Sequence, residues 1–122
     1  MIIAIFKYCY WLYTEWSLEM RQSNEFKAKI FKALGDPVRL EIIEFLCDGE
    51  KSVLEMTEHL KVIQPVVSRH LKILKACGLV KDRKEGNQRF YSITNPETFK
   101  VIGTITPELV EILFRRNVEQ IA

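Results

Sequence analysis

The 122-residue sequence predicts a mainly α-helical domain with one small β-hairpin, an α+β fold. In most segments apolar residues recur every three or four positions, and these segments begin at capping residues or prolines, as helices do. Two alternating segments flank Glu85-Gly86-Asn87, which indicates a hairpin with a short turn. The length fits a single domain over residues 1–122, with an N-terminal extension (1–19), a core (24–93) and C-terminal helices (94–122).

The first 16 residues are the only strongly apolar stretch. Lys7 interrupts a run that is already shorter than the ~20 residues needed to cross a bilayer, and the flanks do not resemble a secretory leader. We therefore expect a cytoplasmic protein whose N-terminal helix is covered by a second subunit. The alternative is that Met20 is the natural start and that residues 1–19 are a mis-assigned extension.

Two more helices are predicted before residue 50. Residues 24–34 have helical periodicity and are followed by Gly35, and their apolar face is formed by Phe26, Ile30, Phe31 and Leu34. Asp36-Pro37 then combines a capping carboxylate with a proline suited to a first helical position. The helix that follows should be mostly buried, with Arg39 solvated or ion-paired on its surface.

A helix-turn-helix pattern follows. Ser52 and Glu55 have the spacing of a capping box and open a short helix that runs to Leu60. A second helix over residues 64–77 begins after a tight connection. Ile63 stands where a capping side chain is usual, at a cost of about 1 kcal/mol.

The second helix has two different faces. Val67, Leu71 and Leu74 form an apolar stripe, whereas another face carries hydrogen-bonding and cationic side chains and no carboxylate. Such a face suits base edges and phosphates in a DNA major groove. The candidate DNA-binding residues of this helix are Gln64, Pro65, Ser68, Arg69, His70 and Lys72.

The hairpin would form a wing beside this helix. Alternation places Tyr91 and Ile93 on its inner face. Four polar or basic residues have the reach to contact phosphates or a minor groove: Arg83, Lys84, Asn87 and Arg89. They could also form a charged edge that resists aggregation, and both functions are compatible. The combined prediction is a winged helix-turn-helix domain.

The charge distribution agrees with nucleic-acid binding. Eight lysines and arginines and two carboxylates lie between Lys61 and Arg89, a local charge of +6, while the rest of the chain carries −4. A concentrated basic region is typical of a nucleic-acid-binding face, although a merely solvated basic surface would look the same.

Two more helices are predicted near the C-terminus. Asn95-Pro96 begins a short helix that ends near Gly103, and Thr106-Pro107 begins another. The apolar side of the last helix is broad and contains Leu109, Val110, Leu113, Phe114 and Val118. It could pack within one subunit, but we expect it to join the N-terminal helix in a dimer interface.

The three cysteines, Cys9, Cys47 and Cys77, lack the spacing of a disulfide framework or a zinc site. We expect Cys47 and Cys77 to be small buried hydrophobic residues, and all three remain candidates for a redox thiol switch. The sequence offers no pair of nucleophile and base, phosphate loop or metal constellation. It therefore predicts neither an enzyme nor a cofactor or metal site.

Several segments together resemble the ArsR/SmtB group of bacterial and archaeal repressors. The matching segments cover residues 33–40, 64–74, 77–80, 83–86 and 91–93. The resemblance implies a homodimeric repressor that binds double-stranded DNA at an inverted-repeat operator and releases it when an inducer binds or reacts. The inducer, a small molecule or a redox agent, is not identified by the sequence.

The metal sites for which that family is known do not carry over. Its Cys-x-Cys motif would fall near Ser52 and Leu54, and neither side chain ligates a soft metal. Its other site uses histidine and carboxylates on the C-terminal helix, where residues 94–122 contain no His, Asp or Cys.

Two other functions would have different signatures. A winged helix used as a protein-interaction module would carry apolar residues in place of Gln64, Ser68 and Arg69. A MarR-like regulator would usually have longer terminal helices than this chain supplies. The sequence therefore favours a sequence-specific DNA-binding regulator of the ArsR type.

Overall fold

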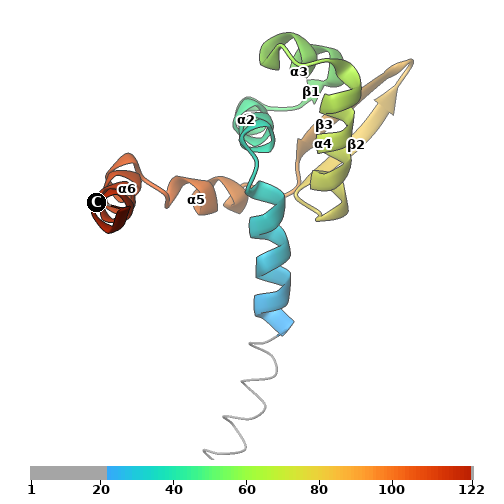
Figure 1. The fold of residues 1–122 in the computed structure, drawn as a ribbon. Coiled ribbons are helices and arrows are strands. Elements are labelled where there is room, and N and C mark those ends of the chain that lie inside the picture. The colour runs from blue at the N-terminus through green and yellow to red at the C-terminus, as the bar shows by residue number, and fades with distance from the viewer. Residues whose placement is uncertain (1–21, 122) are drawn as a thin grey trace, which may run out of the picture.

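A computed structural model describes residues 22–121 (Figure 1). Residues 22–34 form a helix, and the remaining elements, in chain order, are α2 (Pro37–Phe45), a 3₁₀ turn (Leu46–Asp48), β1 (Lys51–Ser52), α3 (Val53–Leu60), α4 (Gln64–Ala76), β2 (Val80–Glu85), β3 (Gln88–Ile93), α5 (Glu97–Gly103) and α6 (Pro107–Ile121). This order confirms the predicted winged helix-turn-helix fold. The predictions for residues 1–19, including Cys9, lie outside the described residues.

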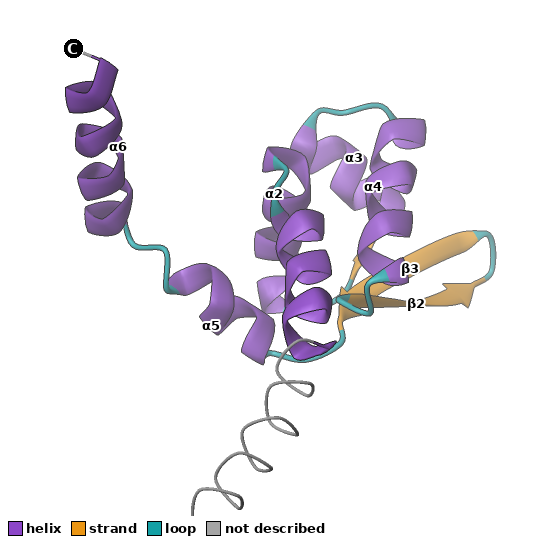
Figure 2. Cartoon of the chain, turned by 60° about the horizontal axis from the view of Figure 1, so that its bottom comes forward, coloured by secondary structure: helices purple, strands orange, loops and turns teal. Residues whose placement is uncertain are grey.

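The helix-turn-helix packs around one apolar core between α2, α3, α4 and the wing (Figure 2). The predicted stripe of α4 is confirmed, since Val67, Leu71 and Leu74 are completely buried. The other fully buried large side chains are Ile42, Ile43 and Met56. Tyr91 of β3 is also buried, so the wing is fixed to the core at its base.

The sheet has three antiparallel strands in the order β1-β3-β2, where the sequence predicted only the β2–β3 hairpin. The additional strand β1 pairs Lys51 with Tyr91 and Ser52 with Phe90. Two residues are too few to show an alternating pattern, so β1 left no periodic signal in the sequence.

The hairpin turn is shorter than expected. Glu85 pairs with Gln88, which leaves a two-residue turn of Gly86 and Asn87. Gly86 has a φ of 61°, whereas the φ of Asn87 is negative, the combination found in type II′ turns. This turn matches the right-handed twist of the two strands, so it fixes their register.

Local capping signals are confirmed at three helix ends. The Oδ1 of Asp36 accepts hydrogen bonds from the backbone N–H groups of Val38 (2.9 Å) and Arg39 (3.3 Å). At α3, the Ser52 hydroxyl accepts from the Glu55 N–H and the Glu55 carboxylate accepts from the Ser52 N–H. The N-cap of α4, Ile63, has no side-chain cap, as predicted.

Helix α4 ends in a Schellman motif. Gly78 has a φ of 74° and its N–H donates to the Lys75 carbonyl at 2.9 Å. The N–H of Leu79 donates to the Leu74 carbonyl at 3.1 Å. The chain therefore turns directly from α4 into β2, and the wing begins beside the helix it accompanies.

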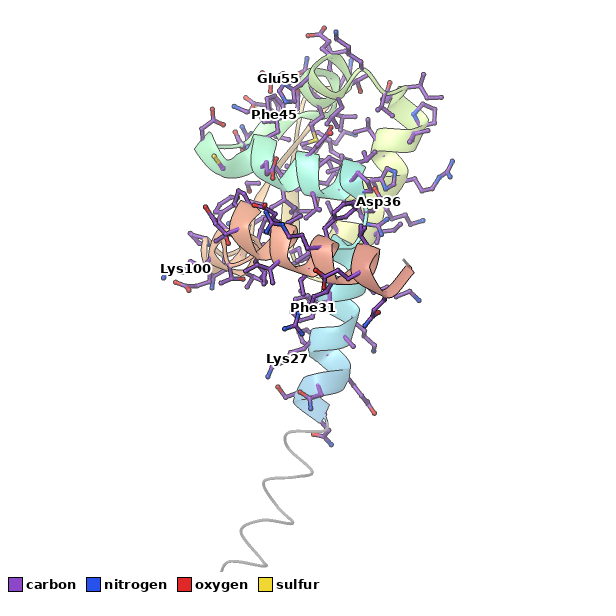
Figure 3. The ribbon with its side chains drawn as sticks, turned by 60° about the vertical axis from the view of Figure 1, so that its left-hand side comes forward. Lys27, Phe31, Asp36, Phe45, Glu55 and Lys100 are labelled. Carbon is purple, nitrogen blue, oxygen red and sulfur yellow. The ribbon has the colours of Figure 1, made fainter. Side chains whose placement is uncertain are left out.

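The Asp36 cap should make the stability of the domain dependent on pH (Figure 3 shows its place at the start of α2). Partial desolvation raises the pKa of Asp36, but the hydrogen bonds from Arg39 and Val38 outweigh it and hold the pKa below its ordinary value of 3.8. Because the pKa of Asp36 is lower in the folded than in the unfolded protein, its charged form stabilises the fold. This stabilisation is present above the unfolded-state pKa and is lost as the pH falls through the folded-state pKa.

Asp36→Asn keeps an acceptor at the cap without a titrating charge. Between about pH 6 and about pH 3, wild-type protein should therefore lose more unfolding free energy than Asp36→Asn, as measured by urea denaturation. Equal losses in the two proteins would show that Asp36 does not contribute to acid sensitivity.

Arg39 was expected to be solvated or ion-paired on the surface, but it is half-buried and bonds to backbone carbonyls. Its guanidinium donates from Nε to the carbonyl of Ala33 and from Nη2 to the carbonyl of Lys32 at 3.3 Å. Its Nη1 lies 3.3 Å from Nδ1 of His70 on α4. Arg39 thus satisfies the last carbonyls of the 22–34 helix and connects that helix to α4.

The terminal helices keep much of their apolar surface exposed. Phe26 and Phe31 of the 22–34 helix are 60% and 58% exposed, so only part of its predicted apolar face packs on the core. Helix α5 contributes Phe99 and Ile102 to the core, whereas α6 contributes none of the described core residues and stands away from the domain (Figures 1 and 2). The exposed large apolar residues of α6 are Leu109, Val110, Ile112, Leu113, Phe114 and Val118.

Candidate nucleic-acid interface

A groove of about 500 Å³ runs between α4 and the wing, and we call it the α4–wing groove. Helix α4 contributes Gln64, Ser68, Lys72 and Lys75. The wing contributes Asp82, Asn87, Gln88, Arg89 and Tyr91, and Ser52, Val53 and Leu54 at the start of α3 complete the lining. The groove therefore brings together five of the ten predicted DNA-binding residues, from both elements that the sequence singled out.

The α4 residues of this groove form one stripe along the helix. Their spacings of four, four and three residues keep them on one face, which lies beside the buried stripe. Lys75 belongs to this stripe, although it was not among the predicted site residues. Its helical spacing from Lys72 was the signal that could have identified it.

Asp82 connects the two walls of the groove. Its Oδ1 lies 2.8 Å from the Lys75 ammonium on α4, and its Oδ2 lies 2.5 Å from the Arg89 guanidinium on β3. The Asp82 side chain is only 9% exposed, whereas Lys75 and Arg89 are 51% and 52% exposed. The hydrogen bonds from Lys75 and then Arg89 hold the pKa of Asp82 below its ordinary value, so the carboxylate stays charged at neutral pH.

Comparison with known proteins identifies the family. Residues 36–82 match the model of the bacterial regulatory proteins of the arsR family. The helix-turn-helix transcriptional regulator MJ1325 of Methanocaldococcus jannaschii is 46% identical over 85 residues, which are 69% of this chain and 96% of MJ1325. The chain belongs to the ArsR family. This ArsR-family protein is accordingly a DNA-binding transcriptional regulator and not an enzyme.

Solved structures agree with this assignment for the ArsR-family chain. Reduced HlyU from Vibrio cholerae N16961 matches with a TM-score of 0.65 and 33% identity, covering 71% of this chain and 92% of HlyU. The homodimeric winged helix-turn-helix DNA-binding domain of Mb0332 from Mycobacterium bovis matches with a TM-score of 0.63 and 26% identity. The match covers 83% of this chain and 89% of the Mb0332 domain.

Three predicted residues of α4 lie outside the groove of this ArsR-family regulator. Pro65 and Arg69 are exposed on the adjacent part of the helix surface, and Arg69 forms no ion pair with any residue between 22 and 121. His70 is half-buried and faces Arg39. Arg69 is therefore available to a ligand, whereas His70 already has a protein partner.

The wing of the ArsR-family regulator has two chemically different faces. Arg83 lies on the face away from α4, where it pairs with Glu50 and Glu85 and stacks over Phe90 at 4.7 Å from the ring centre. The hydrogen bonds that Arg83 donates, first to Glu50 and then to Glu85, raise its pKa. Lys84 is exposed and pairs across the strands with Arg89, on the groove side of β2.

The cysteines of the ArsR-family regulator differ in exposure. Cys47 is exposed on the 3₁₀ turn, so its predicted burial was wrong, while Cys77 is half-buried against the core. Within residues 22–121, no three His, Cys, Asp or Glu side chains cluster as metal ligands would, and no helix there is long and apolar enough to span a membrane.

Proposed function

We propose that this ArsR-family protein is a homodimeric repressor that binds an inverted-repeat operator, with α4 in the major groove and the wing on the flanking backbone. The observation that carries the proposal is the α4–wing groove, where residues of α4 and of the hairpin share one basic surface. Two separate elements that present cations to the same side can follow a duplex across both a groove and its phosphates.

The start of α4 supplies the groups suited to base recognition. Gln64 and Arg69 are both exposed on its first two turns. A glutamine can form a bidentate pair with adenine, and an arginine can form one with guanine. Ser68 is short and better suited to a phosphate or a single base edge. We therefore assign sequence reading to Gln64 and Arg69 and backbone contacts to Lys72, Lys75 and Arg89.

The terminal helices support a dimer. Six large apolar side chains of α6 are between 38% and 66% exposed, more apolar surface than one helix of a soluble monomer usually presents. The similar domain of Mb0332 is homodimeric. A two-fold axis would place two copies of α4 in successive major grooves about 34 Å apart.

Selection of binding sites from a random duplex library tests the proposal. Wild-type protein should select an inverted repeat whose half-sites are about one helical turn apart. Gln64→Ala and Arg69→Ala should each lose preference at one or two symmetric positions, because a bidentate contact gives about 1 to 3 kcal/mol of discrimination.

Lys100→Ala is the control for these variants. Lys100 is exposed on α5, outside the groove, and its only ion pair with a residue between 22 and 121 is a surface pair with Glu97. Its selected consensus should equal that of the wild type. A single half-site would contradict the dimer, and an unchanged consensus for both Gln64→Ala and Arg69→Ala would contradict base reading by α4.

A further inference from the structure

We propose that Asp82 is a positioning residue for DNA binding, which holds Lys75 and Arg89 as a preset pair of cations. The inference rests on the proposed use of the α4–wing groove. Its evidence is the geometry of one carboxylate whose two oxygens bind two different cations at 2.8 Å and 2.5 Å. The three side chains come from α4, β2 and β3, so one acidic group connects α4 to both strands of the wing.

The exposures of the three side chains separate their functions. Asp82 is nearly covered at 9% exposure, so it has little surface to offer a ligand. Lys75 and Arg89 remain about half exposed, so their charges still face the groove. The cations are therefore available to phosphates while their side chains are already ordered.

The prior ordering of the Lys75 and Arg89 side chains should strengthen binding to the operator. Long side chains such as lysine and arginine lose conformational freedom when they bind, and that cost reduces affinity. Asp82 restricts both side chains before DNA arrives. It also fixes the angle between α4 and the wing, because Lys75 cannot keep its ion pair if β2 moves away from the helix.

Simple electrostatics predicts the opposite change in DNA affinity when Asp82 is removed. A carboxylate in a groove that receives phosphates should repel them, and its removal should tighten binding to every duplex. If Asp82 positions the two cations, its removal should instead weaken binding to the operator, although the protein gains a positive charge. The direction of the change therefore decides between the two accounts.

The experiment compares wild-type protein with Asp82→Asn by fluorescence anisotropy. The probes are the duplex selected by the wild-type protein and a scrambled duplex of the same length. Asp82→Asn should bind the selected duplex about tenfold more weakly and the scrambled duplex no more weakly than the wild type, so the specificity ratio falls. Tighter binding of Asp82→Asn to both duplexes would overturn the inference.

Two further variants keep the test decisive. Glu85→Gln removes a wing carboxylate that is 66% exposed and lies outside the groove, and it should modestly tighten binding to both duplexes. Asp82→Glu keeps the charge but moves the carboxylate, so it should weaken operator binding. This variant still tests the inference if circular dichroism shows that Asp82→Asn is unfolded. Wild-type affinity in Asp82→Glu, alongside an unfolded Asp82→Asn, would assign Asp82 to folding alone.

Failure of this inference can be told apart from failure of the proposed function. If Lys75→Ala and Arg89→Ala leave operator affinity unchanged, the groove does not bind DNA and the proposed function is wrong. If they weaken binding but Asp82→Asn does not, only the positioning role is wrong. In the Lys75→Ala background, the effect of Asp82→Asn should be smaller than in the wild type, because Asp82 acts through that cation.

Discussion

Val67→Asp should abolish the cooperative unfolding of the domain, whereas Val67→Ala should only reduce its stability by about 2 kcal/mol. Val67 is completely buried on the stripe that seats α4 on the core. An unpaired carboxylate at this position costs several kcal/mol, a large part of the 5–15 kcal/mol that typically stabilises a domain. Urea denaturation followed by circular dichroism measures both effects.

Ile63→Asp is the matched control for Val67→Asp. It also replaces an aliphatic residue of the same region by aspartate, but Ile63 is 68% exposed and occupies the N-cap of α4, where no side chain caps the helix. Aspartate there should stabilise the domain by about 1 kcal/mol. Similar unfolding midpoints for the two variants would mean that α4 is not seated on the core as described.

Simultaneous replacement of Lys72, Lys75 and Arg89 by alanine should remove most of the DNA affinity, on the order of a thousandfold at low salt. These residues supply cations to the groove from both α4 and β3. Each lost phosphate contact should make the dependence of log K on log salt shallower by about one unit, or roughly six units for a dimer. Titrations at several salt concentrations measure the slope.

Lys100→Ala again serves as a control, since it removes a cation outside the groove and should leave the slope unchanged. Arg83→Ala tests separately whether the outward face of the wing also touches the backbone, because Arg83 is already paired with Glu50 and Glu85. A triple variant with the wild-type slope but a new consensus would show that these cations read sequence instead of binding phosphates.

Much of the fold could be predicted because its signals are local. The cap at Asp36, the capping box at Ser52 and the glycine after α4 each depend on residues within a few positions, and all three are present in the structure. The buried stripe of α4 follows from its period alone. Short-range chemistry therefore determined the helix boundaries and the face that α4 buries.

The missed features depend on contacts between distant segments. Arg39 bonds to carbonyls six and seven positions earlier and lies near a histidine 31 positions later, and no periodicity indicates such partners. The pairing of Asp82 with Lys75 likewise requires the angle between α4 and the wing. Cys47 became exposed because the chain tightens to a 3₁₀ turn after Phe45, which rotates later side chains away from the α-helical pattern.

The two-residue turn at Gly86-Asn87 constrains how the wing can change length during evolution. Side chains alternate between the two faces of a strand, so inserting one residue into β2 or β3 would exchange the inward and outward sets beyond the insertion. Arg83 would then turn toward α4, and Asp82 or Arg89 would face away from it. Longer wings that keep the groove intact should therefore arise by adding residues in pairs on both strands, while single insertions should be confined to the turn itself.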